Sequence, residues 1–367
     1  MHGEAIPQGL NVMSMLLNID LHTALSIIML GFMGGVLSGF IGSGGAFIMT
    51  PGMMNMGVPG IMAVSANIAH KFGKAMVGQK KHGEFGHVDR KLGLFMCISS
   101  FLGIQLAVLV NKKIFASGGA TGSDLYISLF FVGFLSIIGT SMLLDCRTKK
   151  GACGTADAGP SKALYNFFQK FALPPIIHFK TAGVKVSFWV LSFCGLLTGY
   201  LAGTIGVGGF IGVPAMIYIF GVPTAIAAGT ELFLAMFMGA FGAFQYAWAG
   251  YIDLRLTLLL YLGSLVGLMI GTFSTKFVKE IYIRLVTAVI ILLCVGSRAV
   301  VIPAYLNELG YAHVSEQTVH TVKMLSTILL FGSGIIATGM ILVIAIGTHL
   351  KRLRRVSLIP GLQYERL

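Results

Sequence analysis

The chain has 367 residues, of which 56% are hydrophobic and only 11% are charged, with 26 Lys and Arg against 13 Asp and Glu. Soluble domains carry about 25% charged residues, so the composition excludes a soluble globular fold as well as disordered, collagen-like and disulfide-scaffold chains. The net charge of +13 resembles that of a nucleic-acid-binding protein, but the charges lie between apolar segments. This placement indicates a membrane protein whose partner is the lipid bilayer rather than a nucleic acid.

Apolar segments of about 20 residues, the length that crosses the hydrocarbon core as a helix, recur along the chain. We predict spans, in chain order, at 22–42, 92–110, 124–145, 186–205, 254–274, 282–302 and 322–349. The segments 60–82 and 224–247 are long enough to cross but are interrupted or unusual in composition. Two apolar stretches, Ser43–Pro59 and Val207–Pro223, are too short for a normal span.

The distribution of Lys and Arg favours a fold in which both short stretches cross the membrane, either fully or as half-helices. With the N-terminus outside, most of the basic residues then lie inside, as the positive-inside rule requires. They lie in segments 80–91, 146–185 and 275–284 and in the C-terminal tail. If the short stretches turned back instead, several of these basic segments would be exported whichever end is cytoplasmic.

The chain resembles itself at a constant offset of 164 residues. The matches include Gly39, Ile41, Gly42, Gly44 and Gly45 with Gly203, Ile205, Gly206, Gly208 and Gly209, and 57–59 with 221–223. Five crossings per repeat is an odd number, so the halves face opposite ways. We therefore predict an all-α polytopic membrane protein, an inverted repeat of two five-crossing halves with broken helices plus one extra C-terminal span.

The same pattern divides the chain into four regions. They are a first transmembrane repeat (1–145), a basic cytoplasmic linker (146–185), a second transmembrane repeat (186–305), and an extra helix with a basic cytoplasmic tail (306–367).

Two glycine clusters are predicted to break helices inside the bilayer. They are Gly42, Ser43, Gly44 and Gly45 in the first repeat, and Gly206, Val207, Gly208 and Gly209 in the second. Each cluster ends a long span and opens a short helix, whose free N–H groups form a site suited to an anion. The alternative is that the glycines only allow close helix packing.

Ionisable residues within predicted spans mark a second candidate region. Lys71 lies eleven residues after Gly60, which is about 16 Å along a helix and close to mid-membrane. A cation there is costly and usually marks a substrate or ion path. Lys74 shares its helix face, although its side chain is also long enough to reach the cytoplasmic surface. His70 is either a hydrogen-bonded interior histidine or a proton relay.

Glu231 is the only acid well inside a predicted span, and its equivalent in the first repeat is Asn67. It is expected to pair with a lysine, to bind a coupling proton, or to bond to helix backbone. Asn67 and Gln245 are further candidates for polar pocket walls. The sequence contains no HExxH, Walker A or GxSxG motif, so we predict neither an enzyme nor a cofactor or metal site.

The repeated order of a Gly-rich helix, a GxGG break, a short stretch with an inner proline, a GVP and an Ala-rich helix resembles the TauE/SafE family of sulfite exporters. It is carried by Gly39–Pro59 and Gly203–Pro223. The resemblance implies a secondary transporter of the bacterial inner membrane, a permease for sulfite, a sulfonate or a related organic anion. A coupling proton or sodium ion is left open. The alternatives are a passive anion channel and a membrane sensor or scaffold.

Overall fold

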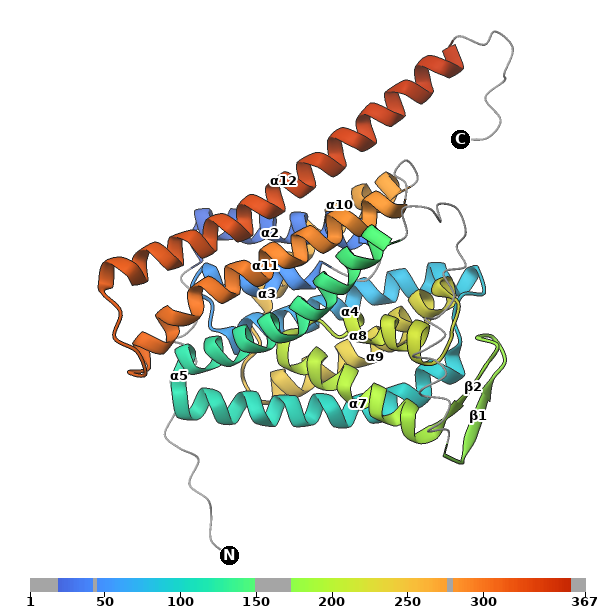
Figure 1. Cartoon of the computed structure of the whole chain (residues 1–367), viewed down its shortest axis with the longest axis horizontal. Helices are drawn as coiled ribbons and strands as arrows, with labels where there is room; N and C mark the ends of the chain where they lie inside the picture. Colours follow the sequence, from blue (N-terminus) through green and yellow to red (C-terminus); the bar gives the residue numbers. More distant parts are fainter. Residues whose placement is uncertain (1–18, 42–44, 149–172, 276–279, 358–367) are drawn as a thin grey trace, which may run out of the picture.

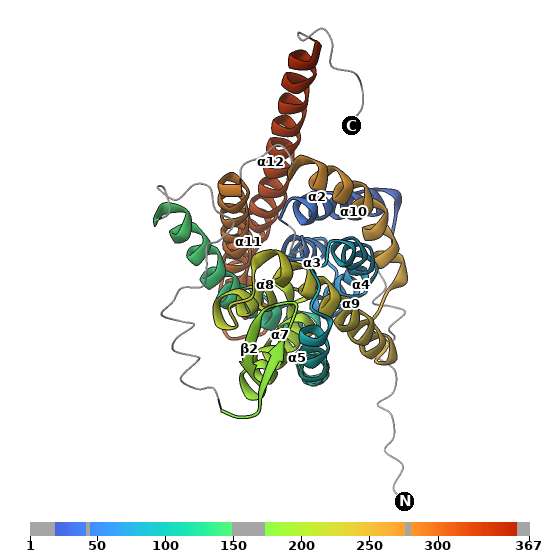
Figure 2. The ribbon, with the colours of Figure 1, turned by 90° about the vertical axis from the view of Figure 1, so that its right-hand side faces the viewer.

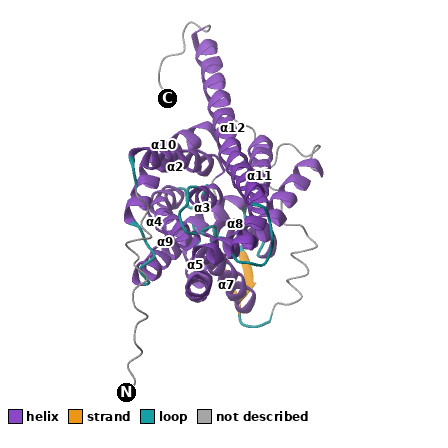
Figure 3. Cartoon of the chain, turned by 90° about the vertical axis from the view of Figure 1, so that its left-hand side faces the viewer, coloured by secondary structure: helices purple, strands orange, loops and turns teal. Residues whose placement is uncertain are grey.

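The computed structural model describes residues 19–41, 45–148, 173–275 and 280–357. Most of these residues form helices that lie side by side, with one small β-hairpin at an end of the bundle (Figures 1 and 3). The elements are α2 (Leu21–Ile41), α3 (Ala46–Asn55), α4 (Gly60–Glu84), α5 (Arg90–Thr148), β1 (Ile176–Phe179), β2 (Val184–Ser187), α7 (Phe188–Ile205), α8 (Gly209–Pro214), η1 (Ala215–Ile219), α9 (Thr224–Trp248), α10 (Leu254–Thr275), α11 (Glu280–Glu308) and α12 (Glu316–Ser357).

Within the described ranges, seven helical segments are long and apolar enough to cross a membrane. One of them, α5, contains two of the predicted spans, because its chain turns back at Gly119. The φ of Gly119 is 60°, a left-handed conformation that glycine adopts without the cost that a Cβ would bring. The chain is therefore a polytopic, mostly helical membrane protein, as the apolar segments predicted.

Two pairs of parallel helices pack with their backbones in close contact, and glycines permit it. A Cβ on Gly35 of α2 would lie 2.7 Å from the Cα of Ser264 on α10. A Cβ on Gly199 of α7 would lie 2.6 Å from the Cα of Ser100 on α5. The offset of 164 residues relates Gly35 to Gly199 and Ser100 to Ser264, so equivalent residues make equivalent contacts in the two pairs.

Helices α4 and α9 pack against each other toward the middle of the bundle, next to α3 and α8 (Figure 2). The Ser65 hydroxyl near the start of α4 donates to the carbonyl of Tyr251, just past the end of α9 (2.7 Å). At the opposite end, Gly229 near the start of α9 abuts the carbonyl of His87, just past the end of α4. The two helices are therefore antiparallel.

The short stretch Val207–Pro223 differs from the single short helix that we expected. It contains the six-residue α8 followed by the π-helix η1. Its counterpart in the first repeat, α3, is a ten-residue helix, about 15 Å long, and is too short to cross the hydrocarbon core alone.

A small β-hairpin accompanies the helices at residues 176–187, where the predicted linker meets the second repeat. Strands β1 and β2 form an antiparallel hairpin in which Ile176 pairs with Ser187. The Asp89 carboxylate, just before α5, accepts hydrogen bonds from the N–H of Leu92 (2.9 Å) and from the N–H of Ala182 in the hairpin turn (2.9 Å). The cap of α5 therefore also holds the hairpin against the bundle.

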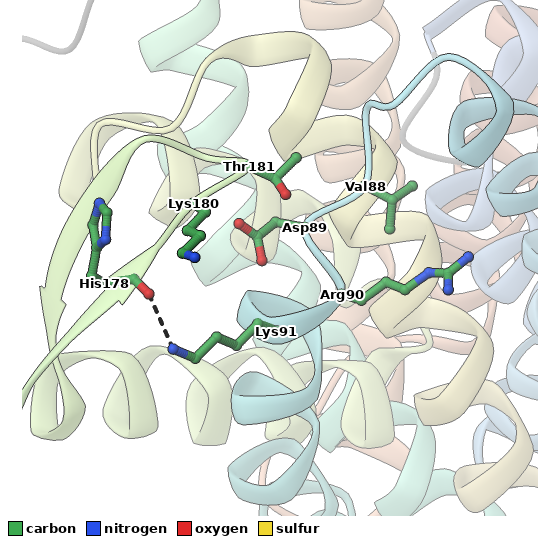
Figure 4. Close-up of a pocket in the computed structure, with 7 residues that line it drawn as sticks. All are labelled: Val88, Asp89, Arg90, Lys91, His178, Lys180 and Thr181. Carbon is green, nitrogen blue, oxygen red and sulfur yellow. Dashed lines mark hydrogen bonds between the residues drawn. The ribbon is translucent and has the colours of Figure 1, made fainter.

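A shallow cavity of about 340 Å³ lies between this hairpin and the start of α5. Figure 4 shows the side chains that line it, namely Val88, Asp89, Arg90, Lys91, His178, Lys180 and Thr181. The Lys91 ammonium closes one wall, because it donates to the carbonyl of His178 (3.1 Å) and lies 5.7 Å from the centroid of the Phe179 ring.

Candidate functional site

The first glycine break lies mostly outside the described residues, since Gly42, Ser43 and Gly44 fall in the gap before α3. Gly45 is buried, and a Cβ there would overlap the backbone of Gly34 in α2. This glycine therefore serves close helix packing, the alternative role that we considered for the cluster.

The second break is fully described and buried. Gly206 ends α7 with a φ of 78°, and Val207, Gly208 and Gly209 follow it in the interior. Polar side chains of the first repeat fill the turn. A Cβ on Gly206 would lie 2.9 Å from the Asn67 amide nitrogen and 3.2 Å from the Thr50 hydroxyl.

These side chains bond to carbonyl groups at the second break and at the start of α3. The Thr50 hydroxyl donates to the carbonyl of Ile205 (3.3 Å), while the Asn67 amide donates to the carbonyl of Ala46 (3.0 Å) and to the Thr50 hydroxyl (2.8 Å). Side chains of the first repeat therefore pack against the second break, and α8, which follows it, is only six residues long.

A side chain from α10 bonds to the backbone in the middle of α4. The Tyr261 hydroxyl donates to the carbonyl of Ala69 (2.8 Å) and accepts from the N–H of Gly73 (2.9 Å). In a regular helix those two backbone groups would bond to each other. A Cβ on Gly73 would lie 2.5 Å from the Tyr261 hydroxyl, so a glycine is needed where the tyrosine enters.

The turn of α4 that Tyr261 contacts carries His70 and Lys71. His70 is buried, and its Nε2 lies 2.5 Å from the Ser264 hydroxyl of α10. Its ring centroid is 4.9 Å from that of Tyr261. His70 is therefore a hydrogen-bonded interior histidine that ties α4 to α10, which is the first of the two roles that its position suggested.

Lys71 and Glu231 form the central charged pair. The Lys71 Nζ lies 3.8 Å from the Glu231 Oε1, and the two side chains are only 13% and 5% exposed. Within the described part of the chain, neither the Nζ nor either carboxylate oxygen has a hydrogen-bond partner. A close charged hydrogen bond would measure about 2.7–2.9 Å, so these two charges attract each other without being hydrogen-bonded.

Lys74 lies one turn further along α4 and is also buried. Its Nζ donates to the Ser38 hydroxyl of α2 (2.6 Å), and the residue is 9% exposed. The alternative in which Lys74 reaches the membrane surface is therefore wrong. Gln245 is half-buried near the far end of α9, fourteen residues or about 21 Å along the helix from Glu231. It does not join this group.

Arg298 in α11, which the sequence analysis did not select as a candidate, is completely buried. Its guanidinium donates to the Asn55 side chain at the C-terminal end of α3 and to the Ser326 hydroxyl of α12 (2.9 Å). A cation is favourable at a helix C-terminus, so Arg298 stabilises the end of the short helix. Its position inside the predicted span 282–302 could have indicated from the sequence that this cation is buried.

The comparisons with known proteins address the chain as a whole. The family model described as "Sulfite exporter TauE/SafE" matches residues 27–298. The chain belongs to the TauE/SafE family. This match covers most of both glycine-paired helix sets and the Lys71–Glu231 pair.

Two proteins of Bacillus subtilis (strain 168) are similar to this TauE/SafE member. "Probable membrane transporter protein YunE" is 22% identical over 276 residues, covering 73% of this chain and 94% of that protein. "Probable membrane transporter protein YjnA" is 23% identical over 250 residues, covering 68% and 89%. No solved structure matches the chain. The protein is thus a multi-pass membrane transporter and not an enzyme.

Proposed function

We propose that this TauE/SafE protein is a secondary transporter that moves a small anion, such as sulfite, a sulfonate or a related organic anion, across the bacterial inner membrane. The observation that carries the proposal is the Lys71 ammonium, which is buried deep in α4 without a described hydrogen-bond partner. A buried cation inside a membrane is costly and typical of a substrate path.

The surroundings of Lys71 favour an anion over a cation. Lys74 adds a second buried positive charge on the same helix face, and among the described residues it bonds to the neutral hydroxyl of Ser38. Glu231 is paired with Lys71. The two lysines outnumber the one carboxylate, so the surroundings favour a small anion over a cation.

Transport by alternating access requires two bundles that move against each other around the site. The equivalent contacts of Gly35 with Ser264 and of Gly199 with Ser100 support an inverted repeat of two halves. The antiparallel packing of α4 on α9 supports it as well, because these helices are equivalent at the 164-residue offset. We propose that the two halves rock about this central pair.

We infer an orientation with the N-terminus outside and the C-terminus in the cytoplasm. The basic loop 85–91 and the hairpin 176–187 lie at the same end of the bundle, joined through Asp89 and Lys91. The connection between α11 and α12 lies at the opposite end (Figure 1). The positive-inside rule assigns the basic hairpin end to the cytoplasm.

The test is uptake of radiolabelled sulfite and methanesulfonate into proteoliposomes that contain the purified protein. Lys71→Ala is expected to abolish saturable uptake, because it removes the buried positive charge. Lys80→Ala is the matched control, since Lys80 lies on the same helix but is exposed. Uptake of both anions by a folded Lys71→Ala variant at the rate of the control would refute the site.

Counterflow separates a transporter from a passive anion channel. Liposomes loaded with unlabelled anion are expected to accumulate external labelled anion transiently, because an alternating-access site exchanges one for the other. A channel would instead give large single-channel currents in planar bilayers and no counterflow. A sensor or scaffold would give neither signal.

A further inference from the structure

We propose that Glu231 is a proton-binding coupling site, which takes up a proton when an anion displaces its carboxylate from Lys71. The inference rests on the proposed function and adds the coupling ion and the residue that carries it. In the anion-free protein the carboxylate occupies the position beside the ammonium that a substrate anion would need.

The geometry of the pair is suited to an exchange of partners. The Lys71 Nζ and the Glu231 Oε1 are 3.8 Å apart, and no described residue donates a hydrogen bond to either carboxylate oxygen. A buried charged pair is well stabilised only when its remaining lone pairs and protons are satisfied by further hydrogen bonds. This pair lacks such hydrogen bonds among the described residues. An entering anion can therefore replace the Glu231 carboxylate beside Lys71 without breaking other hydrogen bonds.

The neighbours of Glu231 leave Lys71 as its counterion. The helices and turns packed against α9 are α4, α5, α7, α8 and η1. From α4 the charged residue facing the carboxylate is Lys71, and from α5 the thiol of Cys97 lies within electrostatic range. Gly212 of α8 abuts the Oε2, and Thr198 of α7 lies beside Gly212.

Other charged groups near the pair are already occupied. The Lys74 ammonium donates to Ser38. Asp89, whose N–H bonds to the hydroxyl of Thr230 next to Glu231, directs its carboxylate to the N–H of Leu92 and of Ala182. Within the described residues, the ion pair of Glu231 with Lys71 is the one that an entering anion would disturb.

Loss of the neighbouring counterion then links the anion to a proton. If an anion takes the place beside Lys71 while Glu231 stays ionised, the displaced carboxylate has no cation beside it in a buried site, since the Lys74 ammonium is bonded to Ser38, and this is costly. A proton on Glu231 removes that charge, and the neutral acid gains an O–H donor that can face the bound anion. Anion binding and proton binding therefore favour each other, and the linkage is reciprocal.

The first repeat supplies an internal comparison. The equivalent of Glu231 is Asn67, an uncharged amide whose nitrogen bonds to Ala46 and Thr50. A side chain of similar shape without a titrating proton is therefore accommodated at the equivalent position. The acid, and with it the proton site, occurs in one half only.

The test uses methanesulfonate, because this probe keeps a single negative charge across the whole pH range from 5.5 to 8.5. Binding to the purified protein in weakly buffered solution is expected to consume one proton per anion. Its affinity should fall about ten-fold per unit of pH increase where the free site is ionised and the loaded site is protonated. A pH gradient, acid outside, should then drive its accumulation in proteoliposomes.

Glu231→Gln is expected to bind methanesulfonate with an affinity independent of pH and to lose accumulation driven by the pH gradient. Glu308→Gln is the matched control, because Glu308 also pairs with a lysine, Lys323, but lies 34% exposed at the bundle end. This control should keep the pH dependence of the wild type.

The outcomes separate the two proposals. Counterflow by the wild type with no proton uptake on binding overturns the coupling role of Glu231 and leaves anion transport standing. So does a Glu231→Gln variant that still accumulates the anion in response to pH. If the wild type shows counterflow of neither sulfite nor methanesulfonate, the proposed function fails and this inference with it. The proton uptake of the wild type decides the question even if the variant does not fold.

Discussion

Replacement of Gly199 by alanine tests whether the close contact between α7 and α5 holds the bundle together. The new Cβ would lie 2.6 Å from the Cα of Ser100, with backbone atoms as its three nearest neighbours. An ordinary contact of this kind measures 3.4–4 Å. The two helices must therefore separate by roughly 1 Å along a contact that runs through the membrane interior.

The expected magnitude follows from two opposing effects. Overpacking typically costs about 1–3 kcal/mol, and the upper end applies because backbone cannot rotate away as a side chain can. Alanine in place of a helix-interior glycine returns about 0.5–1 kcal/mol. We expect a net loss of about 2 kcal/mol for Gly199→Ala. Gly296→Ala in α11, where a Cβ meets nothing within 4 Å, should gain up to about 1 kcal/mol.

The measurement is unfolding of the purified protein by sodium dodecyl sulfate in mixed micelles, followed by circular dichroism. The two variants should differ by about 3 kcal/mol, or about 100-fold in the unfolding equilibrium. Gly35→Ala should resemble Gly199→Ala, because its Cβ would lie 2.7 Å from the Cα of Ser264. A Gly199→Ala protein as stable as Gly296→Ala would refute the reasoning.

Three further changes test other contacts. Asp89→Ala removes the cap of α5 and the bond to the hairpin, so it should cost about 1–2 kcal/mol and speed hydrogen–deuterium exchange in the hairpin; unchanged exchange would contradict the docking. Arg298→Ala removes the guanidinium donor to Asn55, which keeps only the long bond from the Ser326 hydroxyl (3.4 Å), and should cost about 1–3 kcal/mol, whereas no loss of stability would argue against a stabilising role. Tyr261→Phe removes the hydroxyl that bonds to the backbone of Ala69 and Gly73. Those two groups can bond to each other within the helix, so stability should change by less than about 1 kcal/mol while the KM for counterflow rises. An unchanged KM would show that the tyrosine does not position Lys71.

Much of the fold follows from local composition. Helices that face lipid need long apolar runs, and these runs predicted the spans that α2, α7, α10 and α11 occupy. The place of Lys71 along α4 also followed from counting residues from Gly60, because a helix rises by a constant length per residue. These properties depend on residues that are close in the chain and on the lipid around each helix, so local sequence is enough to predict them.

The partners of each polar group were decided by the tertiary structure. The pairing of Lys71 with Glu231 joins residues 160 positions apart. The Tyr261 hydroxyl of α10 reaches the backbone of α4 because Gly73 has no side chain in its way. The second glycine break is filled by Thr50 and Asn67 of the first repeat. Such contacts depend on how each helix is rotated and shifted along its axis relative to its neighbours. Side-chain packing fixes this arrangement only when all the helices have assembled. Composition therefore determines that segments cross the membrane, whereas packing determines which buried groups of the described residues, such as Lys71 and Glu231, lack a hydrogen-bond partner.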